Sequence, residues 1–458
     1  MSPPMGDAKD SSKETLTNPI ESLEKFLSID SSSLLIRGAA GTGKTTLALR
    51  VLNQSGRKQG VYISSRLSRE KITSQLPPEK GRFKNEQFVD LRFEDAASVL
   101  QKVTLARQNA DVSGIVLDSW DAFANELEEI ERLKTEKMLL SFAVETNKHL
   151  VLVSEVPTAS TMDYLVDGVV ELSRTELDGR VIREISINKL RGTVVDQYRH
   201  IVSLAGGEFV EYQPYSDPDY SKVRRLKPRE DPKSAYSFGN SDMDRVFGGL
   251  GPGTTFTFEY DENVPYGALR AIELCMIQNF LQLGRAALLL PLPGAFQEKL
   301  YDIVSTAAGK AAVKQFSILN QAGSGSGSTA FPKGVTPRRM HDIVTKSMTK
   351  SRRGSRDKGV LLVKCVSALE NVFASDLDGL LQVMSERITS VQQSRDAYVL
   401  FLQSDSPIRS RILSMSSNSA KIFTKNGTVL LAGVKPHTGI FVLENDENPI
   451  IPTLSPVV

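Results

Sequence analysis

The sequence predicts an α/β protein with two domains of similar architecture, each a mostly parallel central sheet with flanking helices and a C-terminal β-hairpin. Three observations lead to this prediction. Short apolar runs alternate with helical segments in both halves of the chain, as in sheets built from strand–helix units. A complete glycine-rich loop motif lies at 38–45, between a predicted strand and a predicted helix. A proline- and charge-rich linker at 213–234 separates the halves.

Composition is that of an ordinary globular protein. The chain has 458 residues, of which 40% are apolar, enough for two or three packed cores. Its net charge of +2 gives no global field that favours nucleic acid or a membrane surface. Cys275 and Cys365 form no metal or redox spacing, which fits a reducing compartment. With no apolar run of membrane-spanning length and no signal-peptide pattern, we expect a cytoplasmic protein without a membrane segment.

The chain begins with a polar stretch, residues 1–18, which is rich in Ser, Lys, Asp and Pro and is predicted to be disordered. Apolar residues at helical spacing predict a short helix over 20–27. The apolar run at 34–36 is then the first buried strand, and it leads directly into the loop motif.

The loop reads Gly-Ala-Ala-Gly-Thr-Gly-Lys-Thr and matches G-x-x-x-x-G-K-[ST] in full. Such a loop curls so that its backbone N–H groups point at phosphate oxygens, at the positive end of the following helix. Lys44 can reach the β- and γ-phosphates, and the Thr45 hydroxyl can ligate Mg²⁺. The motif therefore predicts binding of a nucleoside triphosphate, with these binding residues: Gly38, Ala39, Ala40, Gly41, Thr42, Gly43, Lys44, Thr45 and Thr46.

An apolar strand predicted at 113–119 ends in an acid, Asp118. This is the Walker B form, in which the carboxylate lies at the end of a strand beside the phosphate loop and holds Mg²⁺, usually through a water. The predicted metal ligands are thus Thr45 and Asp118, and Lys44 and Asp118 are predicted catalytic residues.

The rest of the first domain, 19–212, is predicted from periodicity. Strands are expected at 60–64, 88–91 and 150–155, and a hairpin turns at Asp178-Gly179 between strands at 168–172 and 182–187. An amphipathic helix is expected over 125–145. Its candidate core positions are Leu127, Ile130, Leu133, Leu140 and Phe142.

The second domain, 235–458, is predicted to be a degenerate copy of the first. Predicted strands recur in the same order, at 255–258, 286–290, 359–364, 398–402, 429–437 and 440–443. The segment 259–267 lacks the glycine pattern and the lysine, and its carboxylates (Glu259, Asp261 and Glu262) would repel a polyphosphate. Lys364 is predicted to stand where Asp118 stands in the first copy. The alternative is an unrelated α/β domain.

A flexible basic insert is expected at about 321–358 in this second domain. It starts in a Gly/Ser repeat, and its second part, 338–358, carries eight Lys or Arg residues against two acids. A solvated loop is the favoured interpretation, with contact to nucleic acid or to an acidic partner as the alternative. The insert has no aromatic interleaving that would indicate base stacking.

With these motifs placed, residues 20–210 resemble the RecA superfamily, and within it the KaiC-like ATPases, including the archaeal gas-vesicle regulator group called GvpD. Residues 61–68 and the region before the phosphate loop look GvpD-like. Residues 241–250 are similar to the lead-in of a KaiC repeat. The resemblance implies two RecA-like P-loop NTPase domains in tandem, the second without a functional P-loop, and ATP as the ligand.

The resemblance also implies a site shared between subunits. In KaiC-like rings a Lys-x-Arg-Gly-Thr segment reaches the γ-phosphate of the neighbouring subunit, and here the matching residues are Lys189, Arg191 and Thr193. Lys189 and Arg191 are therefore candidate catalytic residues of a homo-oligomer, in the manner of an arginine finger. The alternative is that both are ordinary charges at a strand end.

One departure from the family concerns hydrolysis. KaiC-like enzymes have adjacent glutamates after the second strand, one of which activates water, whereas this chain has Arg66-Leu67 there. We therefore expect slow ATP hydrolysis. Three carboxylates could substitute: Glu70, Asp121 and Glu155.

The functional expectation is an ATP-binding regulatory ATPase whose second domain offers a surface to a protein partner. Two alternatives are a RecA/RadA-type DNA-binding recombination accessory protein, which only the basic insert supports, and a scaffold that assembles with ATP without hydrolysing it.

Overall fold

A computed structural model describes residues 18–28, 31–54, 59–75, 87–94, 96–292, 299–320, 328–332 and 334–458. The chain forms two compact units. The first runs to Pro214 and includes Val457 and Val458, and the second runs from Tyr215 to Pro456. The stretch predicted to be disordered lies outside the described residues except for Asn18, whose side chain caps the first helix.

The first unit is built on a nine-stranded sheet with the order β3-β2-β4-β5-β1-β6-β7-β8-β9. The strands are β1 (Ser33–Gly38), β2 (Gln59–Ser64), β3 (Phe88–Asp90), β4 (Val112–Asp118), β5 (His149–Ser154), β6 (Gly168–Leu177), β7 (Arg180–Leu190), β8 (Arg199–Ser203) and β9 (Val210–Glu211). The first six in sheet order, β3 to β6, run parallel, and β7 to β9 continue antiparallel. Strand β1 lies between β5 and β6, so its carboxyl end is in the middle of the sheet. Open α/β sheets bind ligands at this edge, beyond the carboxyl ends of their strands.

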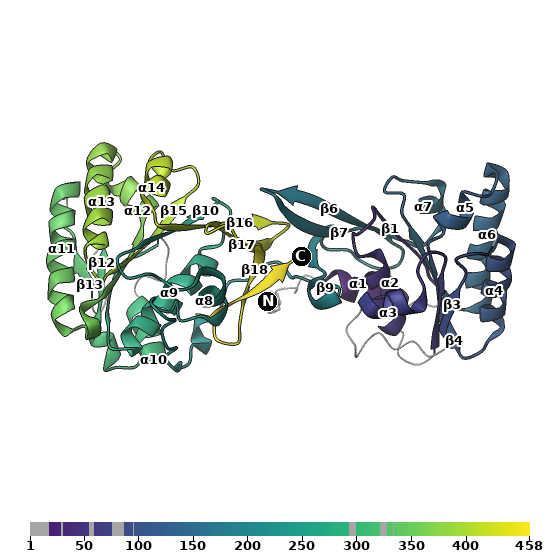
Figure 1. Cartoon of the computed structure of the whole chain (residues 1–458), viewed down its shortest axis with the longest axis horizontal. Coiled ribbons are helices and arrows are strands. Elements are labelled where there is room, and N and C mark those ends of the chain that lie inside the picture. Colours follow the sequence, from purple (N-terminus) through teal and green to yellow (C-terminus); the bar gives the residue numbers. More distant parts are fainter. Residues whose placement is uncertain are drawn as a thin grey trace, which may run out of the picture. The chain divides into compact units, whose positions relative to one another are not determined.

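Helices cover both faces of this sheet (Figure 1). The first face carries α1 (Pro19–Leu27), α2 (Lys44–Gln54) and α3 (Arg69–Gln75), and the second carries α4 (Ala96–Gln108), α5 (Asp121–Ala124), α6 (Glu129–Thr146) and α7 (Thr161–Leu165). Each face of the sheet forms a hydrophobic core with its helices, and successive residues along a strand point into one core and then the other. Val116, for example, packs on the α2 face and Leu117 on the α6 face.

The buried face of α6 agrees only in part with the one predicted, of whose positions Leu140 packs against the core. The helix begins at Glu129, four residues later than expected, and Ile130 is 70% exposed. Glu136 and Leu139 are the buried positions instead, and the indole N–H of Trp120 donates to Glu136 at 3.4 Å. The side chain of Phe142 lies outside the described residues. A buried glutamate interrupts the apolar pattern, so periodicity identified this face only in part.

The second unit is built on a ten-stranded sheet with the order β13-β12-β11-β14-β15-β10-β16-β17-β18-β19. The strands are β10 (Thr255–Tyr260), β11 (Ala286–Leu290), β12 (Phe316–Asn320), β13 (Ser328–Ala330), β14 (Val360–Cys365), β15 (Ala397–Gln403), β16 (Asn418–Lys425), β17 (Thr428–Lys435), β18 (Ile440–Asn445) and β19 (Pro452–Val457). With β10 matched to β1 and the others in turn, this order repeats that of the first sheet and adds β13 at one edge. The two sheets thus share one topology, as the repeated strand pattern predicted.

Two hydrophobic cores cover the faces of the second sheet. One contains α8 (Ser241–Phe247), α9 (Tyr266–Gln282) and α10 (Leu300–Ala308), and the other contains α11 (Pro337–Gly354), α12 (Val366–Val372), α13 (Leu377–Gln392) and α14 (Arg409–Met415). Figure 1 shows α11 and α13 together on one face and α9 on the other.

The prediction that Lys364 takes the place of Asp118 is wrong by one residue. Asp118 is the last residue of β4, and the last residue of β14 is Cys365. In register, Asp118 and Ile36 both pair with Val153, whereas Cys365 and Phe258 both pair with Phe401. Because side chains alternate between faces, Lys364 points into the α11–α13 core, away from the face that carries α9.

The proline-rich stretch 213–234, predicted as an interdomain linker, belongs for the most part to the second unit. That unit begins at Tyr215, the third residue of the stretch. The Tyr215 hydroxyl donates to Asn445 Oδ1 at 3.0 Å, and Val223 is buried. Farther along, Asp231 forms an ion pair with the buried Arg285. Prolines and charges here indicate an extended segment packed on a domain surface, not a free spacer.

Most of the described part of the basic insert is helical. Residues 321–327 lie outside the described residues, but α11 continues for 18 residues with Thr336 as its N-cap. Met340, Val344 and Met348 are buried at a spacing of four, so the helix packs on the sheet and points its cations outward. The many Lys and Arg residues obscured this apolar stripe in the sequence.

No helix in the described ranges combines the length and the apolar character needed to cross a membrane.

Candidate functional site: a phosphate loop beside Asp118

The predicted phosphate loop joins β1 to α2, as the motif requires. Gly38 ends β1, and Lys44 is the first residue of α2. A Cβ atom on Gly38 would stand 2.2 Å from the carbonyl oxygen of Leu172 on the neighbouring strand β6. Gly43 has φ +101°, and a Cβ there would stand 2.8 Å from Leu204 Cδ2. Both positions therefore exclude any larger residue, which accounts for the first and last glycines of the motif.

Lys44 is buried and folds back over its own loop. Its ammonium group donates to the carbonyl oxygen of Ala39 at 2.9 Å, and the Thr42 hydroxyl donates to the same oxygen at 2.8 Å. Burial lowers the pKa of Lys44, the Asp118 carboxylate opposes this, and Arg66 lowers the pKa further. A bound polyphosphate would stabilise the charged form of this lysine through charge-assisted hydrogen bonds.

The predicted metal ligands lie next to each other. The Thr45 hydroxyl donates to Asp118 Oδ2 at 2.7 Å, across the space between α2 and the end of β4. A hydroxyl and a carboxylate are the hard oxygen ligands that Mg²⁺ prefers, so the donor set fits the predicted ion. Asp118 is followed by a cis peptide bond to Ser119.

Tyr62 is a further member of this group that the sequence did not reveal. It lies on β2, is fully buried, and its hydroxyl donates to Asp118 Oδ2, the oxygen that also accepts from Thr45. Burial raises the pKa of Tyr62 well above its usual value, and the Asp118 charge raises it further, so the phenol stays protonated and acts as a donor. Tyr62 is a positioning residue, since its hydrogen bond can hold the Asp118 carboxylate in one orientation.

We expect Tyr62→Phe to weaken Mg²⁺ binding while leaving Mg²⁺-free nucleotide binding unchanged. Phenylalanine fills the same space, but Asp118 loses a hydrogen bond to a charged group, worth roughly 1.5–3 kcal/mol in general. A Mg²⁺ titration at fixed ATP should show an affinity about 3- to 10-fold lower, if part of that energy holds the carboxylate. Tyr164→Phe is the control because Tyr164 is 81% exposed. Equal Mg²⁺ affinity in all three proteins would contradict the positioning role.

A cavity of about 320 Å³ opens over these groups. It is lined by Ala40, Gly41, Gly43, Lys44, Thr45, Thr46, Ser64, Arg66, Leu67, Asp118, Glu155 and Leu204. Most of the predicted loop residues and Asp118 thus border one space. Ser64, Leu67 and Leu204 are additional lining residues, and they come from segments far apart in the chain.

Comparison with known proteins also identifies a P-loop domain in this part of the chain. Residues 23–188 match the family model described as the GvpD gas vesicle protein P-loop domain. The first unit contains a GvpD-like P-loop domain.

Two relatives come from Halobacterium salinarum (strain ATCC 700922 / JCM 11081 / NRC-1). Protein GvpD2 is 28% identical over 322 residues, which cover 63% of this chain and 65% of that protein. Protein GvpD1 is 28% identical over 318 residues, which cover 63% of this chain and 59% of that protein. The alignments therefore span less than two thirds of each relative. Since 63% of 458 residues is about 290, more than the 214 residues that precede the unit boundary, the similarity extends into the second unit.

In the GvpD-like P-loop domain, the three carboxylates considered for water activation occupy different places. Glu155 lines the cavity and forms an ion pair with Arg66, the residue that stands where KaiC-like enzymes have glutamate. Asp121 lies at the start of α5 and accepts hydrogen bonds from Ser154 Oγ, at 3.0 Å, and from the Glu155 backbone N–H. Glu70 is exposed at the start of α3 and does not line the cavity. Glu155 is the candidate that the geometry favours.

Lys189 and Arg191 lie near the opposite end of the strands from this domain's own phosphate loop. Lys189 pairs with Val169 at the start of β6, whereas the loop begins beside Leu172. Its ammonium group donates to the carbonyl oxygens of Asp163, at 3.1 Å, and Val166, at 2.6 Å. Arg191 forms an ion pair with Asp167 at 3.0 Å. The structure does not bring either cation to the cavity of the same chain.

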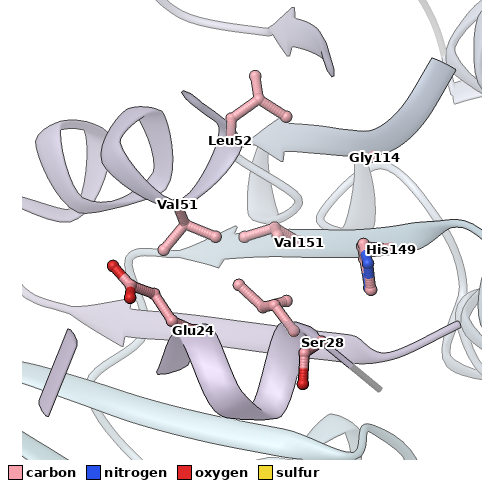
Figure 2. Close-up of a pocket in the computed structure, with 8 residues that line it drawn as sticks. Glu24, Ser28, Val51, Leu52, Gly114, His149 and Val151 are labelled. Carbon is pink, nitrogen blue, oxygen red and sulfur yellow. The ribbon is translucent and has the colours of Figure 1, made fainter. Parts of the chain in front are cut away.

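A second cavity, of about 340 Å³, lies at the amino ends of β4 and β5 in the GvpD-like P-loop domain (Figure 2). The surrounding residues are Glu24 of α1 and its C-cap Ser28, Val51 and Leu52 of α2, and Gly114, His149 and Val151 of the two strands. No residue of the motif takes part. Most of the predicted phosphate-binding residues in the described ranges border the cavity at the other end of these strands.

Proposed function

We propose that this chain is an ATP-binding regulatory protein of the RecA/KaiC-like type that hydrolyses ATP slowly and acts in gas-vesicle control. The observation that carries the proposal is the contact between Thr45 and Asp118 in a cavity bordered by the phosphate loop. Support for the process comes from the matched family, whose description names a gas vesicle protein.

The residues of the site have separate roles in this proposal. Backbone N–H groups at the start of α2 bind phosphate oxygens, helped by the positive end of the helix. Lys44 exchanges its contact with the Ala39 carbonyl for the β- and γ-phosphates. Thr45 and Asp118 hold Mg²⁺, which neutralises charge on the phosphates when it is bound.

Slow turnover follows from the neighbourhood of Glu155. A general base needs a free carboxylate within reach of the water that it activates. Here Glu155 is paired with Arg66, and that pairing competes with water activation. We infer that the protein remains in its ATP-bound state for long periods, as suits a switch whose occupancy carries the signal.

The site is completed in trans in this proposal. Leu34 pairs with Gly168 at the start of β6, and Gly38 pairs with Leu172, four residues farther along β6. Four residues of strand span about 13 Å. The position of Lys189 and Arg191 near the Gly168 end, away from their own loop, supports the proposal that they act on a neighbouring subunit. The partner proposed is a second copy of this chain, with the second unit, proposed to lack a functional P-loop, offering a surface to another protein.

We expect Lys189→Ala/Arg191→Ala to lose at least about 10-fold in phosphate release while still binding ATP, because cations supplied in trans act mainly on the transition state. The decisive experiment mixes this variant with Lys44→Ala. In a shared site, intact loops of one variant meet intact cations of the other, so the mixture should recover part of the wild-type activity. Size-exclusion chromatography with and without ATP should show assembly promoted by nucleotide.

Three outcomes would count against parts of this proposal. Inactive mixtures would contradict the shared site. A wild-type chain that binds ATP as a monomer and releases no phosphate would remove both the oligomer and the enzyme, leaving a nucleotide-sensing switch. A chain that does not bind ATP would remove the proposal altogether.

The recombination alternative rests on α11. Its exposed cations Arg339, Lys346, Lys350 and Arg353 follow one face at spacings of seven, four and three residues. A face of this kind binds phosphates of DNA with a steep salt dependence. DNA binding with such a slope would favour this alternative, whereas the proposed function requires none.

A further inference from the structure

The β6–β7 hairpin extends beyond the end of β1 and overhangs the phosphate loop. Pairing of β1 with β6 stops at Gly38 and Leu172, but β6 continues to Leu177 and β7 begins at Arg180. Two arginines face each other in this overhang, since Arg174 and Arg183 are directly paired across the hairpin.

Both guanidinium groups lie at the loop. Arg183 Nε is 3.4 Å from the carbonyl oxygen of Gly41 and donates to it. Arg174 Nη1 is 3.9 Å from the point where a Cβ atom on Gly41 would stand. Gly41 itself lines the cavity over the phosphate loop. Both arginines thus lie beside the loop at Gly41, one of the residues that line the cavity.

This pair is electrostatically unfavourable without a ligand. Like charges directly opposite in an antiparallel pair destabilise a hairpin. Burial lowers the pKa of Arg183, and the neighbouring Arg174 lowers it further. Among the described residues, neither guanidinium is within ion-pairing distance of a carboxylate. An anion between the two groups would relieve the repulsion.

We propose that Arg174 and Arg183 bind the terminal phosphate of ATP held by the loop of the same chain. This inference rests on the proposed nucleotide binding and adds to it a sensor that acts in cis. Lys44 is the residue expected to reach the terminal phosphates. It contacts Ala39, two residues before the Gly41 that Arg183 contacts, so the Lys44 ammonium and the Arg183 guanidinium lie at the same part of the loop. Arginine suits this role because its planar group binds phosphate through two parallel hydrogen bonds.

The sensor would tie the hairpin to the nucleotide. With ATP bound, the terminal phosphate draws both arginines together. With ADP, the charge between them is missing and the repulsion returns. Strand β7 carries Arg183 and Lys189 and ends one residue before Arg191, so it connects the proposed phosphate sensor to the residues proposed to act on the neighbouring subunit.

The test compares Mg-ATP and Mg-ADP affinities by calorimetry for the full chain and for Arg174→Gln and Arg183→Gln. Arg180→Gln is the matched control, since it removes one positive charge from the same hairpin nearer the turn. We expect each of the first two variants to lose about 10- to 30-fold in ATP affinity and to stay within about 3-fold of the wild type for ADP. The melting temperature without nucleotide should be unchanged or higher, because a like-charge pair is removed.

The outcomes separate this inference from the function on which it rests. If the wild type binds both nucleotides and the variants keep the wild-type ratio of affinities, the sensor is wrong and nucleotide binding stands. Equal losses for ATP and ADP would place the arginines elsewhere on the nucleotide and overturn the terminal-phosphate assignment. A lower melting temperature without nucleotide, with an unchanged ratio, would show a structural role. Failure of the wild type to bind either nucleotide would overturn both proposals.

Discussion

Lys44→Ala is expected to lower ATP affinity by about 100-fold or more. The ammonium group supplies charge-assisted hydrogen bonds to phosphate, and such bonds contribute roughly 1.5–3 kcal/mol each. No other lysine lines the described cavity, so a short side chain at position 44 leaves the phosphate charge without this partner. The nucleotide-free protein should be as stable as the wild type or slightly more stable, because Lys44 is buried and its burial lowers its pKa.

Thermal unfolding separates these two effects. Saturating Mg-ATP should raise the melting temperature of the wild type, since a ligand that binds only the folded state stabilises it. It should leave that of Lys44→Ala unchanged at the same concentration. Lys71→Ala is a suitable control because Lys71 is exposed on α3. A normal ATP-induced shift in Lys44→Ala would mean that nucleotide binds elsewhere.

Lys364→Met is expected to stabilise the second unit, with the largest effect below pH 7. Lys364 is fully buried in the core that contains α11 and α13, and its ammonium nitrogen lies 5.4 Å from the centre of the Tyr398 ring. Burial, with a smaller contribution from the nearby Arg387, lowers its pKa from the usual 10.5 to about 7. Each pKa unit corresponds to about 1.4 kcal/mol, so charging this lysine in the folded state costs up to about 5 kcal/mol.

The direction of the pH effect follows from proton binding. Between pH 7 and about 10.5 the unfolded chain keeps the proton on Lys364 and the folded chain does not. The wild type therefore gains stability as pH rises through this window, and the full penalty is present below pH 7. Methionine has a similar length and no charge, so the advantage of Lys364→Met should shrink towards zero near pH 10.5.

Chemical unfolding at pH 6 and pH 10 would measure this effect, with Lys346→Met as the control because Lys346 is exposed on α11. Circular dichroism reports both units, whereas Trp120 is the one tryptophan of the sequence and lies in the first unit. The fluorescence transition is therefore expected to change less than the dichroism transition. A pH-independent gain, or a loss of stability, would contradict the assigned burial cost.

The phosphate loop and its neighbour Asp118 could be placed from the sequence because their signals are local. The loop motif spans consecutive residues, and Asp118 ends an apolar strand, so neither required knowledge of the fold. Tyr62, Arg174 and Arg183 could not be predicted in this way, because they reach the loop only through strand pairing. Nothing in the local pattern distinguishes them from an ordinary core tyrosine and ordinary surface arginines.

The fold shows the same division. Six of the ten strands in the second unit were predicted from repeated apolar runs, but the face of each side chain was not. A shift of one residue moved Lys364 to the wrong side of the sheet. The helix α11 was missed for a related reason. Its three buried apolar positions are separated by cations that a packed helix tolerates on its outer face.

The position of β1 has a consequence for how this domain can respond to a ligand. All six residues of β1 are buried, and the strand is bonded on both sides, to β5 and to β6. Local opening of such a strand requires breaking two ladders at once, so its amides belong among those that exchange with solvent only when the whole unit unfolds. The root of the phosphate loop is then a fixed point, and any movement that reports the nucleotide is confined to the exposed elements around it.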